Sequence, residues 1–109
     1  MSSPAKLPPP PYYVVIFSTL RTQGDDGYGE MAEKMEKLAE QQPGYLGIES
    51  AREPGGLGIT NSYWKDEASL IAWKKNAEHT LARELGREKW YKCYELRVAK
   101  VERAYAFEK

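Results

Sequence analysis

A single histidine, His79, and a single cysteine, Cys93, carry most of the reactive chemistry that this 109-residue chain could perform. An imidazole has an unperturbed pKa of about 6.5, so His79 is the side chain best suited to act as a general base near neutral pH. Cys93 has no adjacent His, which favours a small buried hydrophobic residue over a nucleophile. One Cys and one His cannot build a multi-ligand site, so we expect no metal.

Trp73 lies six residues before His79, in the same predicted helix. Six residues of one continuous helix turn the chain by about 600°, which leaves the two side chains about 120° apart. Both can face one cavity only if the helix breaks near Asn76. Asn76 would then cap a second short helix whose positive end lowers the His79 pKa and keeps the imidazole neutral. The alternatives are core packing for Trp73 and a surface position for His79.

Three further candidates for a ligand site follow one another in a predicted strand. Asn61 has poor strand propensity, and an amide turned inward must find a hydrogen-bond partner. It either orients a carbonyl or phenol group of a ligand or points outward into water. Tyr63 and Trp64 are consecutive, so one of them faces the helices and the other faces the opposite side of the sheet. The alternation does not say which.

Composition excludes several classes of protein. Lys plus Arg and Asp plus Glu both number 16, and this zero net charge argues against a nucleic-acid partner. A charged fraction of 29% excludes a membrane-embedded chain. Residues 1–11 contain no signal sequence, and four consecutive prolines end them, so we expect a disordered proline-rich tail before one folded domain over residues 12–109. With one Cys, a cytoplasmic location is the default.

Hydrophobic periodicity predicts six elements in the order β-α-β-β-α-β. Apolar residues recur at helical spacing from Tyr28, after a turn in which Asp26 is a candidate cap. Asp66 is the candidate cap of the second helix, and Gly86 is expected to end it. The last strand shifts its hydrophobic phase, which suggests a bulge near residues 99 and 100. The predicted strands cover 12–20, 45–52, 58–64 and 90–107, and the second helix covers 67 to about 85.

This order is that of the ferredoxin-like α+β fold, a four-stranded antiparallel sheet with two helices on one face. The opposite face would expose apolar residues such as Val14 and Ile16, and the last strand extends past its own sheet. A second copy could cover that face and pair with the overlong strand. We therefore expect a homodimer in which the two sheets form a dimeric α/β barrel.

These residues resemble the antibiotic biosynthesis monooxygenase family, whose members form a dimeric α+β barrel. The resemblance covers about residues 12–108 and is carried by three segments, namely the Tyr63-Trp64-Lys65-Asp66 end of a strand, the pair Trp73 and His79, and the closing RVAKVERAY sequence. It implies a cofactor-independent monooxygenase that deprotonates an aromatic or polyphenolic substrate and lets the anion pass an electron to O2, forming a quinone. His79, Trp73 and Asn61 would be catalytic, and Tyr63, Trp64 and Asn76 would bind the substrate.

Three other functions remain open. Heme-degrading members of the family carry an Asn on the first strand and an iron-binding His ten residues after the Trp. Here residues 12–20 contain no Asn, and Arg83 stands ten residues after Trp73. The barrel could also bind a small hydrophobic aromatic ligand without turnover, or serve only as a structural dimer with filled cavities.

Overall fold

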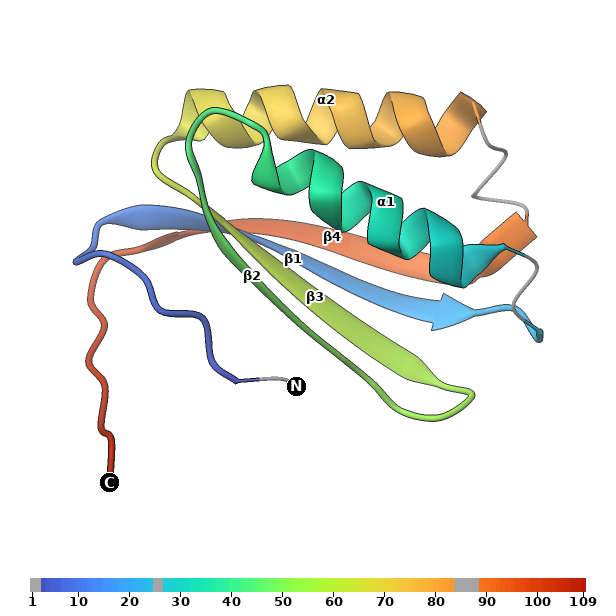
Figure 1. Ribbon diagram of the computed structural model, residues 1–109, viewed down its shortest axis with the longest axis horizontal. Helices are drawn as coiled ribbons and strands as arrows, with labels where there is room; N and C mark the ends of the chain where they lie inside the picture. Colours follow the sequence, from blue (N-terminus) through green and yellow to red (C-terminus); the bar gives the residue numbers. More distant parts are fainter. Residues whose placement is uncertain (1–2, 25–26, 84–88) are drawn as a thin grey trace.

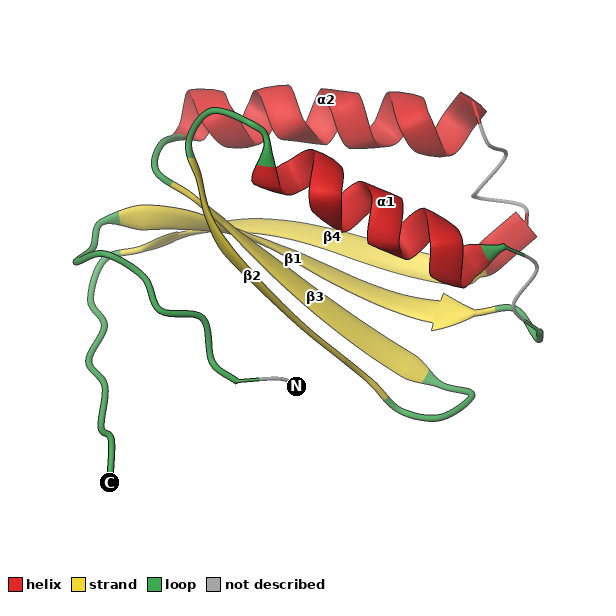
Figure 2. Ribbon diagram, in the orientation of Figure 1, coloured by secondary structure: helices red, strands yellow, loops and turns green. Residues whose placement is uncertain are grey.

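The computed structural model describes residues 3–24, 27–83 and 89–109, which form one antiparallel sheet covered on one face by two helices (Figure 1). The strand order is β2-β3-β1-β4, and every neighbouring pair is antiparallel. This confirms the ferredoxin-like βαββαβ arrangement. The colouring by element in Figure 2 separates the layer of helices from the sheet below it. The elements are β1 (Tyr12–Arg21), α1 (Tyr28–Glu40), β2 (Tyr45–Arg52), β3 (Leu57–Trp64), α2 (Glu67–Arg83) and β4 (Tyr91–Val101).

Strand β1 lies in the centre of the sheet because it is apolar on both of its alternations. It pairs with β3 along one edge and with β4 along the other. Residues directly opposite one another in these pairs share a face of the sheet. Val15 therefore lies in one row with Ser62 of β3 and Val98 of β4, on the side of the helices. Ile16 lies in the next row with Asn61 and Arg97, on the opposite side, which we call the outer face.

Stacked tryptophans form the core between the sheet and the helices. Trp64, at the end of β3, is fully buried, and its ring stacks on that of Trp73 with centroids 5.8 Å apart. Its indole Nε1–H donates to the Ser62 hydroxyl at 3.0 Å, so the buried polar atom has a partner. Trp64 therefore faces the helices and Tyr63 the outer face, as the alternation required. Val15, Ala39 and Leu70 complete the buried cluster.

A glycine sets the position of α2 against the rest of the fold. Gly44, in the turn between α1 and β2, has φ +84°, a conformation that other residues rarely adopt. A Cβ atom placed there would lie 2.0 Å from the Ser69 hydroxyl oxygen in the first turn of α2. The backbone N–H of Ser69 in turn donates to Asp66 Oδ1 at 2.8 Å, which confirms Asp66 as the cap of α2. The absence of a side chain at Gly44 thus lets the two connections pack together.

The N-terminal segment, residues 3–11, crosses the outer face at β2. The backbone N–H of Ala5 donates to Glu49 Oε2 at 2.9 Å, and a Cβ at Gly47 would approach Leu7 Cδ2 to 3.0 Å. Tyr12 and Val14 of β1 are buried although they point away from the helices. Part of the outer face is therefore covered by the chain itself. The assignment of residues 1–11 as a disordered tail stays a prediction.

The last strand differs from its predicted length and register. Strand β4 begins at Tyr91 and ends at Val101, so the apolar residues beyond it, Tyr105 and Phe107, lie outside the sheet and are exposed. The pairing with β1 runs regularly through Ala99 and Lys100, and the irregularity lies at the other end of β4, opposite Leu20 and Arg21. The phase change in the sequence therefore marks the end of the strand and not a bulge. The predicted roles of Asp26 and Gly86 lie outside the described residues.

Candidate functional site

A cavity of about 420 Å³ lies between the helix-facing side of the sheet and the two helices. All four strands and both helices contribute to its lining, so it lies in the interior of the fold and not on one element. Most of the lining side chains are apolar, as is usual for sites that bind small organic molecules. The apolar lining includes Val15, Phe17 and Ile48 from the sheet, Met31 and Met35 from α1, and Trp73 and Ala77 from α2.

Aromatic rings from β1 and β4 build one wall of this cavity. The ring of Phe17 lies 5.7 Å from that of Tyr91 and 5.2 Å from that of Tyr94, measured between centroids. Tyr91 and Tyr94 contact each other edge to face at 5.8 Å. Such tilted and edge-on contacts are the geometry that aromatic pairs prefer, so the rings of this wall stabilise one another. It can pack against a flat aromatic or alicyclic ligand.

Hydroxyl groups on β2 and β3 form the floor of the cavity opposite the helices. Ser50 and Thr60 lie across from each other in the β2–β3 pairing, and their hydroxyl oxygens are 2.8 Å apart. Ser62 also lines the cavity, while its hydroxyl accepts the Trp64 indole hydrogen bond. A hydroxyl both donates and accepts, so this floor can orient a carbonyl or phenol group of a ligand.

One end of the cavity is polar and lies below the first turn of α1. Tyr28 and Tyr91 line it, with ring centroids 6.0 Å apart. Arg52 Nη2 donates to the Tyr28 hydroxyl at 3.4 Å and to the Thr19 hydroxyl at 2.6 Å. The Arg21 guanidinium lies over the Tyr28 ring, with its Cζ atom 3.5 Å from the ring centre. Two guanidinium groups therefore contact the tyrosine at this end.

The Tyr91 hydroxyl is less acidic than that of an ordinary tyrosine. Burial is the main cause of its raised pKa, and the interactions with the neighbouring Tyr28 hydroxyl raise the pKa further. The positive charges of Arg52 and Arg21 act in the opposite direction and oppose this increase only in part. Tyr91 is therefore a neutral hydrogen-bond donor throughout the physiological pH range.

Charged side chains from the two helices also line the cavity. Glu36 lies on α1, and Lys74 and Glu78 lie on α2. Lys74 Nζ is 3.6 Å from Glu78 Oε1, an i,i+4 ion pair in which both side chains are about half exposed. Exposed pairs of this kind contribute little to stability. These three residues are the Asp, Glu, Lys or Arg side chains of the described lining that belong to the helices.

The structure places Trp73 in the cavity and His79 outside its described lining. Trp73 is 9% exposed and lines the cavity with one part of its ring system while stacking on Trp64 with another. Helix α2 continues unbroken past Asn76, whose carbonyl oxygen accepts a hydrogen bond from the Thr80 hydroxyl at 3.0 Å. His79 is exposed on that helix. The break that would bring Trp73 and His79 to one cavity is therefore absent from α2.

Asn61 and Tyr63 lie on the outer face, separated from Trp73 by the sheet. Both donate hydrogen bonds to Glu49 Oε1, Asn61 at 3.4 Å and Tyr63 through its hydroxyl. Tyr63 also contacts the ring of Tyr12 edge to face at 5.9 Å. The Asn61 Oδ1 atom is buried and has no hydrogen-bond partner among the described residues. The structure thus brings Asn61 and Tyr63 together with each other but not with Trp73, Trp64 or Asn76.

Burial lowers the acidity of Tyr63, while hydrogen bonding increases that of Glu49. Burial and the hydrogen bond to the Glu49 carboxylate raise the Tyr63 pKa to about 12. Burial also acts to raise the Glu49 pKa, but hydrogen bonds from Tyr63, the Ala5 backbone and Asn61 outweigh it and hold the pKa below its usual value. At neutral pH this group is a carboxylate that accepts three hydrogen bonds.

Sequence reasoning missed Tyr28, Arg52 and Tyr91 as lining or supporting residues of the cavity. Arg52 is the last residue of β2 and shares its face with Ser50, so strand alternation alone could have placed it beside the cavity. Tyr28 is the first residue of α1, so the turn that precedes this helix could have indicated its position. The position of Tyr91 could not have been predicted, because it depends on the irregular pairing of β4 with β1 at Arg21.

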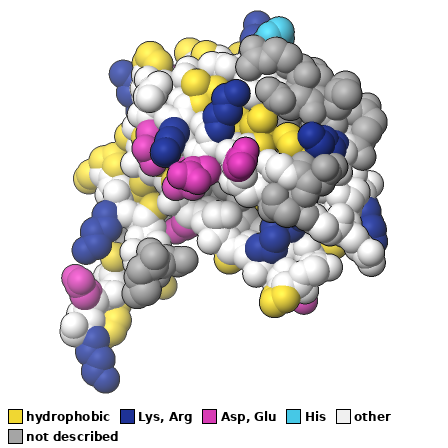
Figure 3. Space-filling view, turned by 45° about the vertical axis from the view of Figure 1, so that its right-hand side comes forward, with side chains coloured by type: hydrophobic (Ala, Val, Ile, Leu, Met, Phe, Trp, Pro, Cys, Tyr) yellow, Lys and Arg dark blue, Asp and Glu magenta, His cyan; other side chains and the backbone are white. Residues whose placement is uncertain are grey.

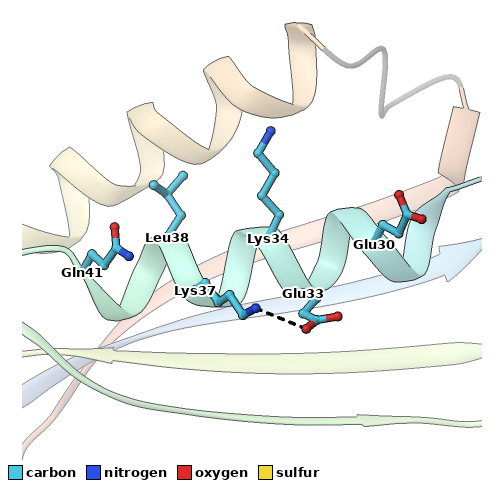
Figure 4. Close-up of a pocket in the computed structure, with 6 residues that line it drawn as sticks. All are labelled: Glu30, Glu33, Lys34, Lys37, Leu38 and Gln41. Atoms are coloured by element: carbon cyan, nitrogen blue, oxygen red, sulfur yellow. Dashed lines mark ion pairs between the residues drawn. The ribbon is translucent and has the colours of Figure 1, made fainter.

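A second hollow, on the outer surface of α1, does not have the character of a site. Its lining consists of five residues of α1 and the residue that follows the helix, namely Glu30, Glu33, Lys34, Lys37, Leu38 and Gln41 (Figure 4). Lys37 and Glu33 form an exposed i,i+4 ion pair at 3.4 Å. Figure 3 shows that side chains of both charges and apolar side chains are interspersed on one face of the molecule. A shallow charged surface of this kind cannot exclude water from a reaction.

The described residues hold no group of three or more His, Cys, Asp or Glu side chains arranged to bind a metal ion. Cys93 is exposed on β4. Within the same described ranges, no helix has both the length and the apolar character needed to span a membrane.

The sequence model of the antibiotic biosynthesis monooxygenases matches residues 11–85. The uncharacterised protein YqjZ of Bacillus subtilis is 51% identical over 104 residues, covering 95% of this chain and 91% of that protein. The jasmonate monooxygenase ABM of Pyricularia oryzae is 31% identical over 93 residues, but the match covers 82% of this chain and only 43% of the fungal protein.

Solved structures show the same fold at low sequence identity. SnoaB, a cofactor-independent oxygenase from Streptomyces nogalater, superposes with a TM-score of 0.72 at 9% identity, over 87% of this chain and 97% of the other. Protein SO0527 from Shewanella oneidensis superposes with a TM-score of 0.69 at 14% identity, over 93% of this chain and 100% of the other. At these identities the likeness concerns the fold alone.

Proposed function

Because the chain belongs to the antibiotic biosynthesis monooxygenase family, we propose that it is a small monooxygenase that oxidises an aromatic or polyphenolic compound to a quinone without a cofactor. The observation that carries the proposal is the aromatic-walled cavity of about 420 Å³ between the sheet and the helices. The likeness in fold to SnoaB supports it, since that protein is a cofactor-independent oxygenase.

The proposed reaction balances with O2 as the only oxidant. A phenol or anthrone-type substrate loses a proton, and the resulting carbanion or phenolate passes an electron to O2. Recombination of the two radicals gives a peroxide anion, which regains the proton and then loses water. A CH2 group of an anthrone or a ring C–H of a phenol thereby becomes C=O, so one oxygen atom enters the quinone and the other leaves as water. The chain's part is to exclude water, to hold the flat substrate and to donate hydrogen bonds to the developing negative charge.

The lining residues suit these tasks. Phe17, Tyr94 and Trp73 present flat surfaces to the substrate, and the hydroxyls of Ser50 and Thr60 can donate to a substrate oxygen. His79 stays our predicted base, but its exposed position on α2 gives the assignment no geometric support within one chain. Asn61, Tyr63 and Asn76 likewise stay predictions that the variants below can test.

We also propose that two copies dock through their outer faces to form the dimeric barrel. Leu20, Leu57 and Ile59 lie on this face and are 39%, 44% and 40% exposed in a single chain. Beyond β4, Tyr105 and Phe107 are 100% and 86% exposed on a segment that leaves the body of the molecule (Figure 1). An apolar face flanked by a protruding apolar segment favours association with a second copy.

The activity is tested by O2 uptake with an anthrone and a hydroxyquinol as probes and with product analysis. Jasmonate is a third probe, because the fungal relative is named a jasmonate monooxygenase. Trp73→Phe should lower kcat/KM by about tenfold or more, because the indole ring lines the cavity and would help to position the substrate. Ile71→Ala, an exposed apolar residue on the same helix, is the matched control and should retain activity.

His79→Ala separates the base assignment from the rest of the proposal. A loss of kcat with an unchanged KM supports His79 as the base, and an unchanged rate removes it. If all probes fail to consume O2 but raise the melting temperature, the cavity binds ligands without turnover and the monooxygenase proposal is wrong.

A further inference from the structure

We propose that the Tyr28–Tyr91 end of the cavity binds the anionic oxygen of an otherwise apolar ligand, with the Arg52 guanidinium supplying the positive charge behind the two hydroxyls. This inference rests on the cavity being the ligand site of the proposed function. It goes further in naming the ligand class, an aromatic or alicyclic body that carries one acidic group, and in assigning a specificity residue.

The Arg52 guanidinium has a fixed place on the sheet. Arg52 of β2 lies opposite Gly58 of β3, which in turn lies opposite Thr19 of β1. A Cβ at Gly58 would lie 2.2 Å from Arg52 Cζ. The Arg52 side chain therefore crosses β3 directly over Gly58, where a side chain would occupy its place. It reaches the buried Thr19 hydroxyl at 2.6 Å and, through Nη1, the Gly56 carbonyl oxygen at 3.0 Å. These bonds hold the guanidinium beside Tyr28.

The charge of Arg52 has no carboxylate partner in the part of the chain that the structure describes. The ion pairs of the described residues join Lys6 with Glu108, Lys37 with Glu33, Lys74 with Glu78 and Arg97 with Glu95. The hydrogen bonds of Arg52 go to hydroxyl and carbonyl oxygens, which are neutral acceptors. A positive charge placed in this way favours an anion nearby and disfavours a cation.

Tyr28 and Tyr91 connect this charge to the cavity. When Arg52 donates to the Tyr28 oxygen, the Tyr28 O–H remains available as a donor. The Tyr91 ring lies 6.0 Å from that of Tyr28, measured between centroids, and also lines the cavity. A donor that itself accepts from a cation is a stronger donor, because hydrogen bonds in a chain polarise one another. A carboxylate or phenolate at this end can therefore accept from the Tyr28 hydroxyl, and also from the Tyr91 hydroxyl when that group donates to the ligand and not to Tyr28.

The remainder of the cavity determines what the acidic group is attached to. Phe17, Met31 and Met35 line the cavity with side chains that offer no hydrogen bond, whereas the charged side chains of Glu36, Lys74 and Glu78 line it from the helices. Burial of an apolar body against the apolar residues contributes about 25 cal/mol per Å² of apolar surface. A ligand with one acidic end and an apolar body satisfies both parts of the cavity.

The test compares sodium 2-naphthoate with 2-naphthamide, which have the same ring system and differ in charge. Binding to the full-length protein is measured by isothermal titration calorimetry at pH 7, without turnover. We expect the wild type to bind the carboxylate about tenfold more tightly than the amide, because a hydrogen bond to a charged group contributes more than a neutral one. Arg52→Gln and Tyr28→Phe should each remove this preference and leave amide binding within about twofold.

Lys37→Gln is the matched control, since it removes one positive charge from the exposed face of α1 and should retain the preference. Equal affinities of the wild type for both probes would overturn the proposal, as would absence of binding by both at millimolar concentration. A loss in Arg52→Gln that is equal for both probes would assign Arg52 to hairpin stability alone. Tyr28→Phe keeps the aromatic ring beneath Arg21 and removes only the hydroxyl. Its preference for naphthoate over naphthamide then shows whether the Tyr28 hydroxyl distinguishes the charged ligand from the neutral one.

The outcomes separate this inference from the proposed function. If the protein binds naphthoate selectively but no phenol probe causes O2 uptake, the proposed anion-binding end of the cavity is supported and the monooxygenase proposal is wrong. If the protein consumes O2 and forms a quinone but binds naphthoate no better than naphthamide, the monooxygenase proposal is supported and the proposed anion-binding end is wrong.

Discussion

The two faces of the sheet differ in what covers them, although the same strands build both. One row across the sheet joins Ile48, Ser62, Val15 and Val98 on the side of the helices, and the next joins Glu49, Asn61, Ile16 and Arg97 on the outer face. The first row contributes to a stacked tryptophan core and a cavity. The second carries a hydrogen-bonded carboxylate under the N-terminal segment and exposed apolar residues beside it.

This difference shows that burial alone does not identify a site. Both faces contain partly buried tyrosines and polar side chains, but on the helix side they surround a space, and on the outer face they bond to one another. On the helix side, the stacked core and the cavity are built by one chain. The outer face is completed partly by residues 3–11 and, by our proposal, partly by a second copy.

The largest expected effect concerns the core on the helix side. Trp64→Ala removes the fully buried indole and its stacking on Trp73, which should lower the free energy of unfolding by about 3–5 kcal/mol. Ile59→Ala, at a 40% exposed position on the outer face of the same strand, should lower it by about 1 kcal/mol or less in a dilute, monomeric sample. Urea unfolding monitored by circular dichroism measures both. Equal losses would mean that the two faces are equally buried.

The next effect concerns association through the outer face. Light scattering at micromolar concentration should give the mass of two chains for the wild type. Ile59→Lys places a charge in the proposed interface and should weaken the dimer by about tenfold or more, which shifts the mass toward one chain. Ile71→Lys, on the exposed side of α2, makes the same change away from the sheet and should leave the mass at two chains. A wild-type chain that stays monomeric at 100 µM or so would contradict the barrel.

The smallest effect is the part of the pH dependence of stability that Glu49 and Tyr63 contribute on the outer face. Because the Glu49 pKa is lowered in the folded state, its contribution to stability is present above the usual glutamate pKa and is lost as the pH falls through the lowered value. The Tyr63 pKa is raised to about 12, so its contribution is present below the usual tyrosine pKa of 10.0 and is lost as the pH rises toward 12.

Melting temperatures measured from pH 3 to pH 11 or so test this pair. Glu49→Gln should flatten the acid limb and Tyr63→Phe the alkaline limb, while Ser50→Ala on the helix side should change neither. Removal of residues 1–8 takes away the Ala5 hydrogen bond and should shift the acid limb to higher pH. An acid limb that is identical in the wild type and Glu49→Gln would show that the hydrogen bonds seen at Glu49 do not determine its ionisation.

The elements could be predicted from the sequence because each depends on a local signal. The apolar run of residues 12–20, the helical spacing from Tyr28 and the cap at Asp66 correspond to β1, α1 and α2 within one or two residues. The end of β4 was misplaced because Tyr105 and Phe107 have strand propensity but no neighbouring strand to pair with. Strand formation depends on a partner, and propensity does not supply one.

The candidate site was harder to predict than the fold. Trp73 lies in the buried cluster and also lines the cavity, which agrees with the burial that its aromatic character indicates, and its catalytic role stays a prediction. Asn61 could not be assigned to a face, because alternation fixes relative and not absolute orientation until the register with β1 is known. Arg52 acquires its position from Gly58 and Thr19, which lie on two other strands. Relations of this kind depend on the register between distant segments.

The proximity of the two chain ends has a practical consequence. Lys6 Nζ lies 3.8 Å from Glu108 Oε2, and the N-terminal segment contacts the outer face of the sheet at Glu49. A purification tag or fluorescent fusion at either terminus would therefore start next to the surface through which we expect copies to meet. Oligomer measurements on tagged material would report the fusion as much as the protein, and a label introduced on the exposed side of α2 avoids this interference.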